Sequence, residues 1–104
     1  SPPVAGPFEI VAEHEEPTGW SFDVQEIRPD GSLAGIRLTL SWADYDLFCP
    51  DGAVAPEGVA RAVLEVAAEL WPDGVPHRFD ASFPRRRAGD ADRRISERVD
   101  LRSM

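Results

Sequence analysis

The spacing of large apolar residues changes once along this chain, from every second residue to every third or fourth residue. Three early segments alternate apolar and polar positions, which is typical of strands with one buried face. Their apolar sets are Phe8, Ile10 and Ala12, then Trp20, Phe22 and Val24, then Ile36, Leu38, Leu40 and Trp42. From Pro56 to Trp71 the apolar residues follow a helical period instead. The pattern predicts an α+β fold of two layers, with one long helix covering one face of a sheet.

Turn residues separate the predicted strands. Pro17-Thr18-Gly19 and Pro29-Asp30-Gly31 each stand between two alternating segments, where proline sets φ and glycine accepts positive φ. The three strands should therefore form an antiparallel meander. A short alternating stretch at 79–83 predicts a fourth strand on the sheet edge, so we expect three or four antiparallel strands.

The chain length of 104 residues fits one domain. Residues 1–7 are rich in proline and should form an extended lead-in, and residues 8–84 should form the single α+β domain. Residues 85–104 form an arginine-rich tail, either extended or carrying a short helix after Gly89-Asp90. Such a helix would bury a thin apolar stripe of Ala91, Ile95 and Val99.

Charge is distributed unevenly. The net charge is −8, and all eleven basic residues are arginines. Residues 1–84 hold four Arg against fifteen Asp and Glu, a balance of −11, whereas residues 85–104 hold seven Arg against four acids, a balance of +3. An acidic body repels phosphate backbones, so nucleic acid is an unfavourable partner. A protein with a basic or neutral surface fits better.

The composition also bears on location. No apolar run approaches the roughly 20 residues that a bilayer span requires, and the first residues lack the basic and apolar stretches of an export signal. Cys49 is the single cysteine, so no intramolecular disulfide forms, and it reads as an inert buried thiol. We expect no membrane association and a reducing, cytoplasmic location.

The segment after Trp42 mixes aromatic residues with carboxylates. Continued alternation would bury Asp44 and Asp46, so we expect a bulge or bend at 43–44 that turns both aspartates outward. The same bulge turns Tyr45, Leu47 and Cys49 inward and leaves Phe48 on the outside. Buried aromatic anchors with a charged rim are typical of protein interfaces. The predicted partner-binding residues are Asp44, Tyr45, Asp46 and Phe48, although a core role for Trp42 and Tyr45 with solvated aspartates is the simpler interpretation.

Catalytic and cofactor signatures are weak. His14, His77, Asp44 and Asp46 are the candidates for a metal-dependent or small-molecule enzyme, because imidazole and carboxylate suit several divalent ions. The two histidines lack the short spacing of a metal motif, and no serine lies in a nucleophile elbow. No glycine-rich phosphate loop occurs, so we expect no cofactor and no metal.

Basic residues concentrate at the C-terminus. They are Arg85, Arg86, Arg87, Arg93, Arg94, Arg98 and Arg102. Three alternatives remain open: the tail folds onto the acidic body, it contacts an acidic partner or anion, chiefly through residues 85–87, or it binds nucleic acid. The four interleaved acids argue against the last alternative.

Several short stretches carry a resemblance. They resemble stretches of small uncharacterised proteins encoded in GC-rich bacterial genomes, and they are Gly19-Trp20-Ser21-Phe22-Asp23-Val24, Leu40-Ser41-Trp42-Ala43-Asp44-Tyr45-Asp46-Leu47 and Phe79-Asp80-Ala81-Ser82. Residues 8–70 are also similar in architecture to HicB-like antitoxin domains, which lay a helix on a small antiparallel sheet. Neither resemblance implies an activity.

The function most consistent with the sequence is a non-enzymatic, acidic protein-binding module of regulatory or inhibitory type. Its partner would be another protein with a basic or neutral surface. A meander leaves at least one strand edge open, so a homodimer by edge-strand pairing is a further alternative. The enzyme and the nucleic-acid contact through the C-terminal arginines remain the competing hypotheses.

Overall fold

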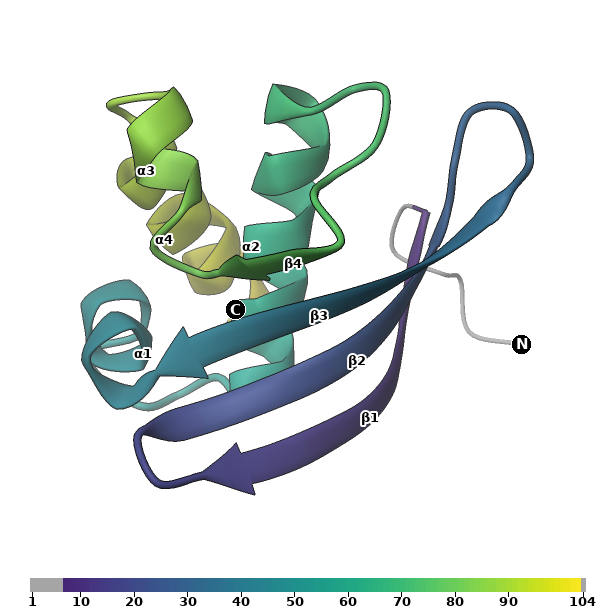
Figure 1. Cartoon of the computed structure of the whole chain (residues 1–104). Helices are drawn as coiled ribbons and strands as arrows, with labels where there is room; N and C mark the ends of the chain where they lie inside the picture. The colour runs from purple at the N-terminus through teal and green to yellow at the C-terminus, as the bar shows by residue number, and fades with distance from the viewer. Residues whose placement is uncertain (1–6, 104) are drawn as a thin grey trace.

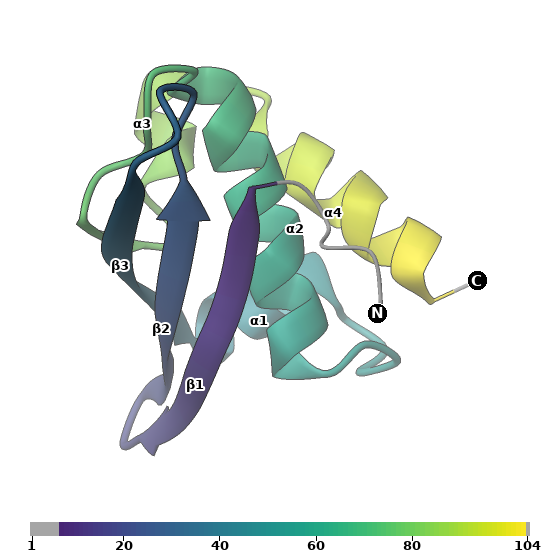
Figure 2. The same cartoon turned by 90° about the vertical axis from the view of Figure 1, so that its right-hand side faces the viewer.

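A computed structural model describes residues 7–103. Its elements are β1 (Phe8–Glu16), β2 (Gly19–Ile27), β3 (Leu33–Ser41), α1 (Trp42–Phe48), α2 (Pro56–Leu70), β4 (Arg78–Asp80), α3 (Pro84–Arg87) and α4 (Ala91–Arg102). All the helices lie on one side of the sheet, and its other face is open (Figures 1 and 2). The predicted two-layer α+β fold is confirmed.

The sheet is mixed, with strand order β1-β2-β3-β4. The first three strands form the predicted antiparallel meander. The fourth strand lies at the expected edge but pairs in parallel with β3, with Arg37 opposite Arg78, so the prediction of a wholly antiparallel sheet is wrong there. The chain leaves the end of β3, and α2 carries it back across the sheet before β4 begins. A helical crossover of this kind returns the chain in a parallel sense.

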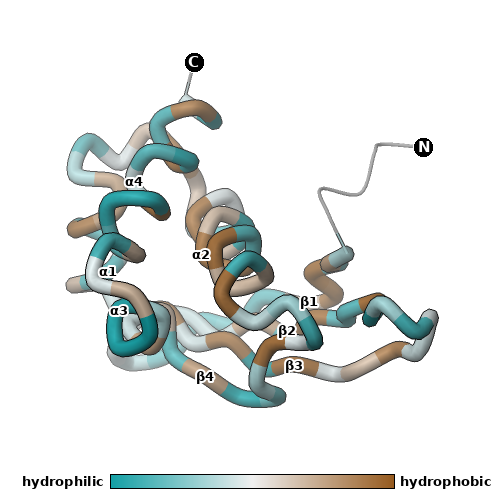
Figure 3. Tube along the Cα trace, turned by 90° about the horizontal axis from the view of Figure 1, so that it is seen from above, coloured by the Kyte–Doolittle hydropathy of each residue, from teal (hydrophilic) through white to brown (hydrophobic). Residues whose placement is uncertain are grey.

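Helix α2 covers the meander. Its Val63 and Leu64 are fully buried, as are Phe22 and Leu38 of the sheet. Figure 3 shows hydrophobic stretches in α2 and in the strands beside it. Each such side chain contributes about 1.5–3 kcal/mol when it leaves water, so this interface forms the centre of the core.

Strand β1 contains a bulge that the alternating pattern did not predict. Ile10 lies opposite Val24, whereas Ala12 lies opposite Asp23, so one residue, Val11, is extra. Residues directly opposite each other in an antiparallel pair share a face. Ala12 is therefore on the open face with Asp23, and its predicted place beside Phe8 and Ile10 is wrong. The bulge moves the following glutamates to the helix side, and Glu15 lies opposite Trp20.

The predicted bend at 43–44 is instead the first turn of α1. Ser41 is the N-cap, and its hydroxyl accepts a hydrogen bond from the Asp44 backbone N–H at 3.1 Å. Because the period changes from two to 3.6, some of these side chains lie on the other side from the one predicted. Phe48 is fully buried and Leu47 is 50% exposed, so the predictions for both residues are wrong. Cys49 is buried, as predicted.

Of the two forms predicted for the C-terminal segment, the structure has the helix. Ala91, Ile95 and Val99 form the predicted stripe and are buried in the common core. Arginines of α4 also pair with glutamates of α2, including Arg102 with Glu65 at 2.6 Å. Within residues 7–103, none of the helices has the length and apolarity that crossing a membrane requires.

Candidate functional site

The outward side of α1 carries an aromatic cluster. Trp42, Tyr45 and Asp46 occupy positions i, i+3 and i+4, which lie on one side of a helix. The ring centroid of Trp20, from β2, lies 6.3 Å from that of Trp42 and 5.3 Å from that of Tyr45, with tilts of 49° and 56°. Tilted pairs at these distances are favourable aromatic contacts. Together with Glu15, which lies opposite Trp20, these residues are called the α1 surface below.

The α1 surface is exposed and held in place. Trp42 is 58% exposed, while its backbone N–H donates to the Thr18 carbonyl at 3.0 Å. The Tyr45 hydroxyl donates to the Val54 carbonyl at 2.5 Å. Burial raises the pKa of Tyr45, and Cys49 nearby adds to the rise, so the hydroxyl stays a neutral donor. The fold thus presents a large ring in a defined position.

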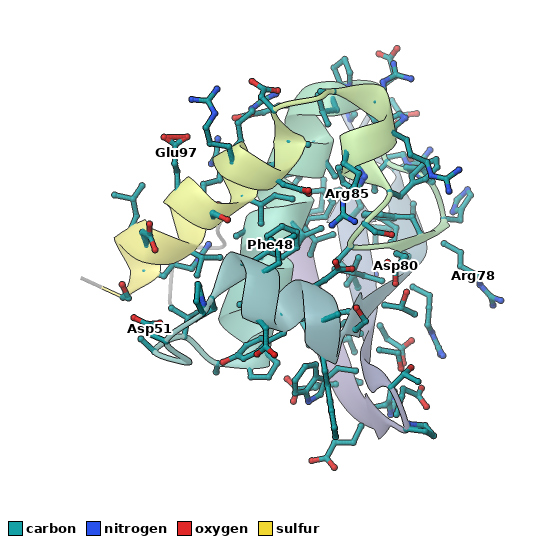
Figure 4. All side chains as sticks on the ribbon, turned by 90° about the vertical axis from the view of Figure 1, so that its left-hand side faces the viewer. Phe48, Asp51, Arg78, Asp80, Arg85 and Glu97 are labelled. Atoms are coloured by element: carbon teal, nitrogen blue, oxygen red, sulfur yellow. The ribbon has the colours of Figure 1, made fainter. Side chains whose placement is uncertain are left out.

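The inward side of α1 is structural. Phe48 is turned into the interior (Figure 4), and Asp44 is 9% exposed. One Asp44 carboxylate oxygen accepts a hydrogen bond from the Arg85 guanidinium at 3.0 Å, and the same guanidinium pairs with Asp92 at 3.0 Å. Burial alone would lower the pKa of Arg85, but the hydrogen bonds to Asp44 and Asp92 raise it. Arg85 therefore joins α1, α3 and α4.

The predicted partner-binding set is thus divided between two sides of one helix. The structure leaves Tyr45 and Asp46 at the surface and removes Asp44 and Phe48 from it. Trp42 lies on the same side as the half-buried Tyr45 and the exposed Asp46, although strand alternation had assigned it to the core. The Ser41-x-x-Asp44 spacing is a helix capping pattern, and it would have predicted that a helix begins at Trp42.

The candidate metal and catalytic residues are dispersed. His14 Nε2 lies 3.0 Å from an Asp23 oxygen on the open face of the sheet. His77 Nδ1 lies 3.2 Å from the Gly35 carbonyl, and Asp44 and Asp46 lie on different sides of α1. Among the described residues, no three His, Cys, Asp or Glu side chains are grouped as metal ligands would be.

A hollow of about 370 Å³ on the open face has polar side chains in its lining. Its lining includes Asp23, Arg37 and His77. Asp23 pairs with Arg37 at 2.9 Å as well as with His14. The hydrogen bond from His14 and the charge of Arg37 lower the pKa of Asp23, so this carboxylate is a paired anion and a weak base.

The arginines at 85–87 have three different surroundings. Arg85 is the partly buried link described above. The Arg87 Nε donates to the Leu70 carbonyl at 3.0 Å, and its guanidinium carbon lies 5.2 Å from the ring centroid of Trp71. Arg86 is exposed. Only Arg86 and Arg87 therefore offer charge to an external group.

Cys49 lies directly after α1 and is held there by a hydrogen bond. The Val54 backbone N–H donates to its sulfur at 3.4 Å, and the thiol lies in the core cluster.

Comparison with protein-family models, curated proteins and solved structures gives no match for this chain.

Proposed function

We propose that this chain is a non-enzymatic protein-binding module that holds a basic or neutral partner protein through the α1 surface. The observation that carries the proposal is the 58% exposure of Trp42 on a fixed aromatic cluster. Tryptophan and tyrosine are enriched among the residues that anchor protein interfaces, because a large ring with a polar edge buries much area against a partner.

The charges beside Trp42 indicate the chemistry of the partner. Asp46 lies one helical turn from Trp42, and Glu15 lies across from Trp20. An arginine or lysine of the partner can stack on the Trp42 ring while its charge pairs with Asp46, which combines a cation–π contact with an ion pair. The same carboxylates disfavour phosphate groups.

The open edge of β1 favours a homodimer less than it favours binding of a different protein. β1 is a nine-residue edge strand that carries Glu9, Glu13, Glu15 and Glu16. Antiparallel pairing with a second copy brings these glutamates close to their counterparts, and facing like charges destabilise a sheet. A different protein with basic side chains meets no such repulsion.

The experiment places a photocrosslinking aromatic amino acid at position 42 and, as a matched control, at position 33, where Leu33 is 61% exposed on the β2–β3 hairpin. A protein captured from native lysate by the first probe alone is then purified. Its affinity is measured with the unmodified chain and with Trp42→Ala, Asp46→Asn and Leu33→Ala.

We expect Trp42→Ala to weaken binding by about 2 kcal/mol or more, as anchor truncations do. Asp46→Asn should slow association and reduce its salt dependence, and Leu33→Ala should bind normally. Equal binding by Trp42→Ala and Leu33→Ala would remove the α1 surface from the interface.

A further inference from the structure

The arginines of this chain fall into two groups. Eight of the eleven have a carboxylate oxygen within 4.0 Å. Within the described residues, Arg78, Arg86 and Arg87 have no such carboxylate. On a chain of net charge −8, acids are abundant, so three unneutralised guanidinium groups are informative.

These three arginines line two adjoining hollows beside β4. One hollow, of about 300 Å³, includes Arg78, Asp80, Phe83 and Arg86 in its lining. The other, of about 410 Å³, is lined by Trp71, Phe83, Arg86 and Arg87. Phe83 and Arg86 are common to both. We call Trp71, Arg78, Phe83, Arg86 and Arg87 the β4-edge surface.

The floor of the β4-edge surface is built from aromatic rings. Trp71 and Phe83 are stacked, with centroids 5.6 Å apart and an interplanar angle of 10°. Arg87 lies against the Trp71 ring and is fixed by its hydrogen bond to the Leu70 carbonyl. Phe83 is 37% exposed. The surface therefore offers a preformed apolar contact, with guanidinium groups beside it.

The one acid in this lining has its own partners. Asp80 accepts hydrogen bonds from the Thr39 hydroxyl at 2.6 Å and from the Ser82 hydroxyl at 2.6 Å and backbone N–H at 3.0 Å. Arg78 is two residues before it in β4 but extends away from the body (Figure 4). The hollow that contains Trp71 has no acid among its lining residues. Arg78 and Arg86 are thus left to pair with an external anion.

We propose that the β4-edge surface binds an acidic segment of a partner protein. Carboxylates of that segment pair with Arg86 and Arg78, and a neighbouring apolar or aromatic side chain packs on Phe83. Guanidinium groups bind carboxylates through two parallel hydrogen bonds, which gives direction as well as attraction. This surface is separate from the α1 surface and goes beyond the function proposed for it.

Charge favours a peptide over a nucleic acid as the occupant. Polyanion binding depends on neutralising many phosphates, whereas among the described residues only the Arg78 and Arg86 guanidinium groups have neither a hydrogen bond nor an ion pair. The acidic remainder of the chain repels a long polyanion. A short segment with a few carboxylates avoids that repulsion.

The test uses a fluorescein-labelled peptide in which glutamates flank one phenylalanine, followed by fluorescence anisotropy at low and at raised salt. Two further probes are a matched peptide with glutamine in place of each glutamate and an oligothymidine strand. The proteins are the full chain, Arg86→Glu, Arg78→Glu, Phe83→Ala and Arg93→Glu. Arg93 is 70% exposed on α4, outside both hollow linings, so its reversal is the matched charge control.

The full chain should bind the glutamate peptide, and Arg86→Glu should weaken that binding by about tenfold or more, the effect of removing a charge-assisted contact. Arg78→Glu and Phe83→Ala should weaken it by smaller factors, and Arg93→Glu should change it by less than about twofold. Circular dichroism confirms that each variant is folded. The proposal is overturned by no binding of the glutamate peptide, by equal binding of the glutamine peptide, by equal weakening in Arg93→Glu, or by tighter binding of oligothymidine.

Discussion

The two sides of α1 carry the same kinds of residue and have different roles. The inward side has one aromatic residue and one aspartate, Phe48 and Asp44, and the outward side has Trp42 and Asp46. Phe48 fills the core and Asp44 binds Arg85, whereas Trp42 and Asp46 face water. A helix of seven residues thus combines an anchor to the fold with the residues that we propose as an anchor for a partner. The difference comes from the elements packed on one side only.

Truncation of Phe48 tests the inward side most severely. Phe48→Ala removes a fully buried ring, so the free energy of unfolding should fall by about 3–5 kcal/mol. Leu47→Ala is the matched control on the same helix, because Leu47 is 50% exposed, and it should cost less than about 1 kcal/mol. Urea denaturation measures both. Similar losses for the two variants would show that α1 does not pack as described.

Loss of the Asp44 carboxylate should have the next largest effect. Asp44→Ala leaves the partly buried Arg85 with Asp92 alone, which should lower the free energy of unfolding by about 1–3 kcal/mol. Asp46→Ala, on the outward side, should change it by less than about 0.5 kcal/mol. A double-mutant cycle with Arg85→Gln isolates the pair. A coupling energy near zero would contradict the link between α1 and α3.

Asp80, the last residue of β4, is a second hydrogen-bonded aspartate to compare with the exposed Asp46. The measurement is the stability of the fold as a function of pH. Burial raises the pKa of Asp80, but hydrogen bonds from Ser82 and Thr39 outweigh burial and hold it below the usual value. A carboxyl whose pKa is lower in the folded state stabilises the fold above its unfolded pKa, near 3.9, and loses that contribution as the pH falls through the folded value.

The stability advantage of the unmodified chain over Asp80→Asn should therefore be about 1 kcal/mol at neutral pH, since the site is partly solvated. It should shrink as the pH falls below about 4. Thermal unfolding at a series of pH values measures it, and Asp46→Asn is the control. An advantage that grows in acid would contradict the assigned hydrogen bonds.

Most of the fold was predictable because burial imposes a period on the sequence. The meander, the long helix and the α4 stripe of Ala91, Ile95 and Val99 each bury one side of a regular element, which leaves a readable pattern. The three residues of β4 do not predict its direction, because parallel and antiparallel pairing place the same side chains inside. Its direction follows from the crossover through α2, a property of the connection.

The candidate site was predicted less well because its helix is short. Over seven residues that directly follow a strand, a period of 3.6 is hard to distinguish from a strand with a bulge, and Trp42 satisfies the strand alternation before it. Only the cap formed by Ser41 separates the two interpretations. The arginines at 85–87 were singled out as a group, but their separate surroundings depend on contacts with α1, α2 and α4 that no local pattern contains.

Truncation of Trp42 should have a small effect on stability and a large effect on recognition. Because Trp42 is 58% exposed, Trp42→Ala should lower the free energy of unfolding by only about 0.5 kcal/mol, through lost contact with Trp20. The Trp42 ring lies beside the Trp20 ring but contributes little to the fold, which agrees with the partner-binding role proposed for it. Parallel urea titrations of Trp42→Ala and Phe48→Ala measure how much each ring contributes to the fold. If Trp42→Ala destabilises the chain as much as Phe48→Ala does, the ring belongs to the core, and the two sides of α1 do not differ in role.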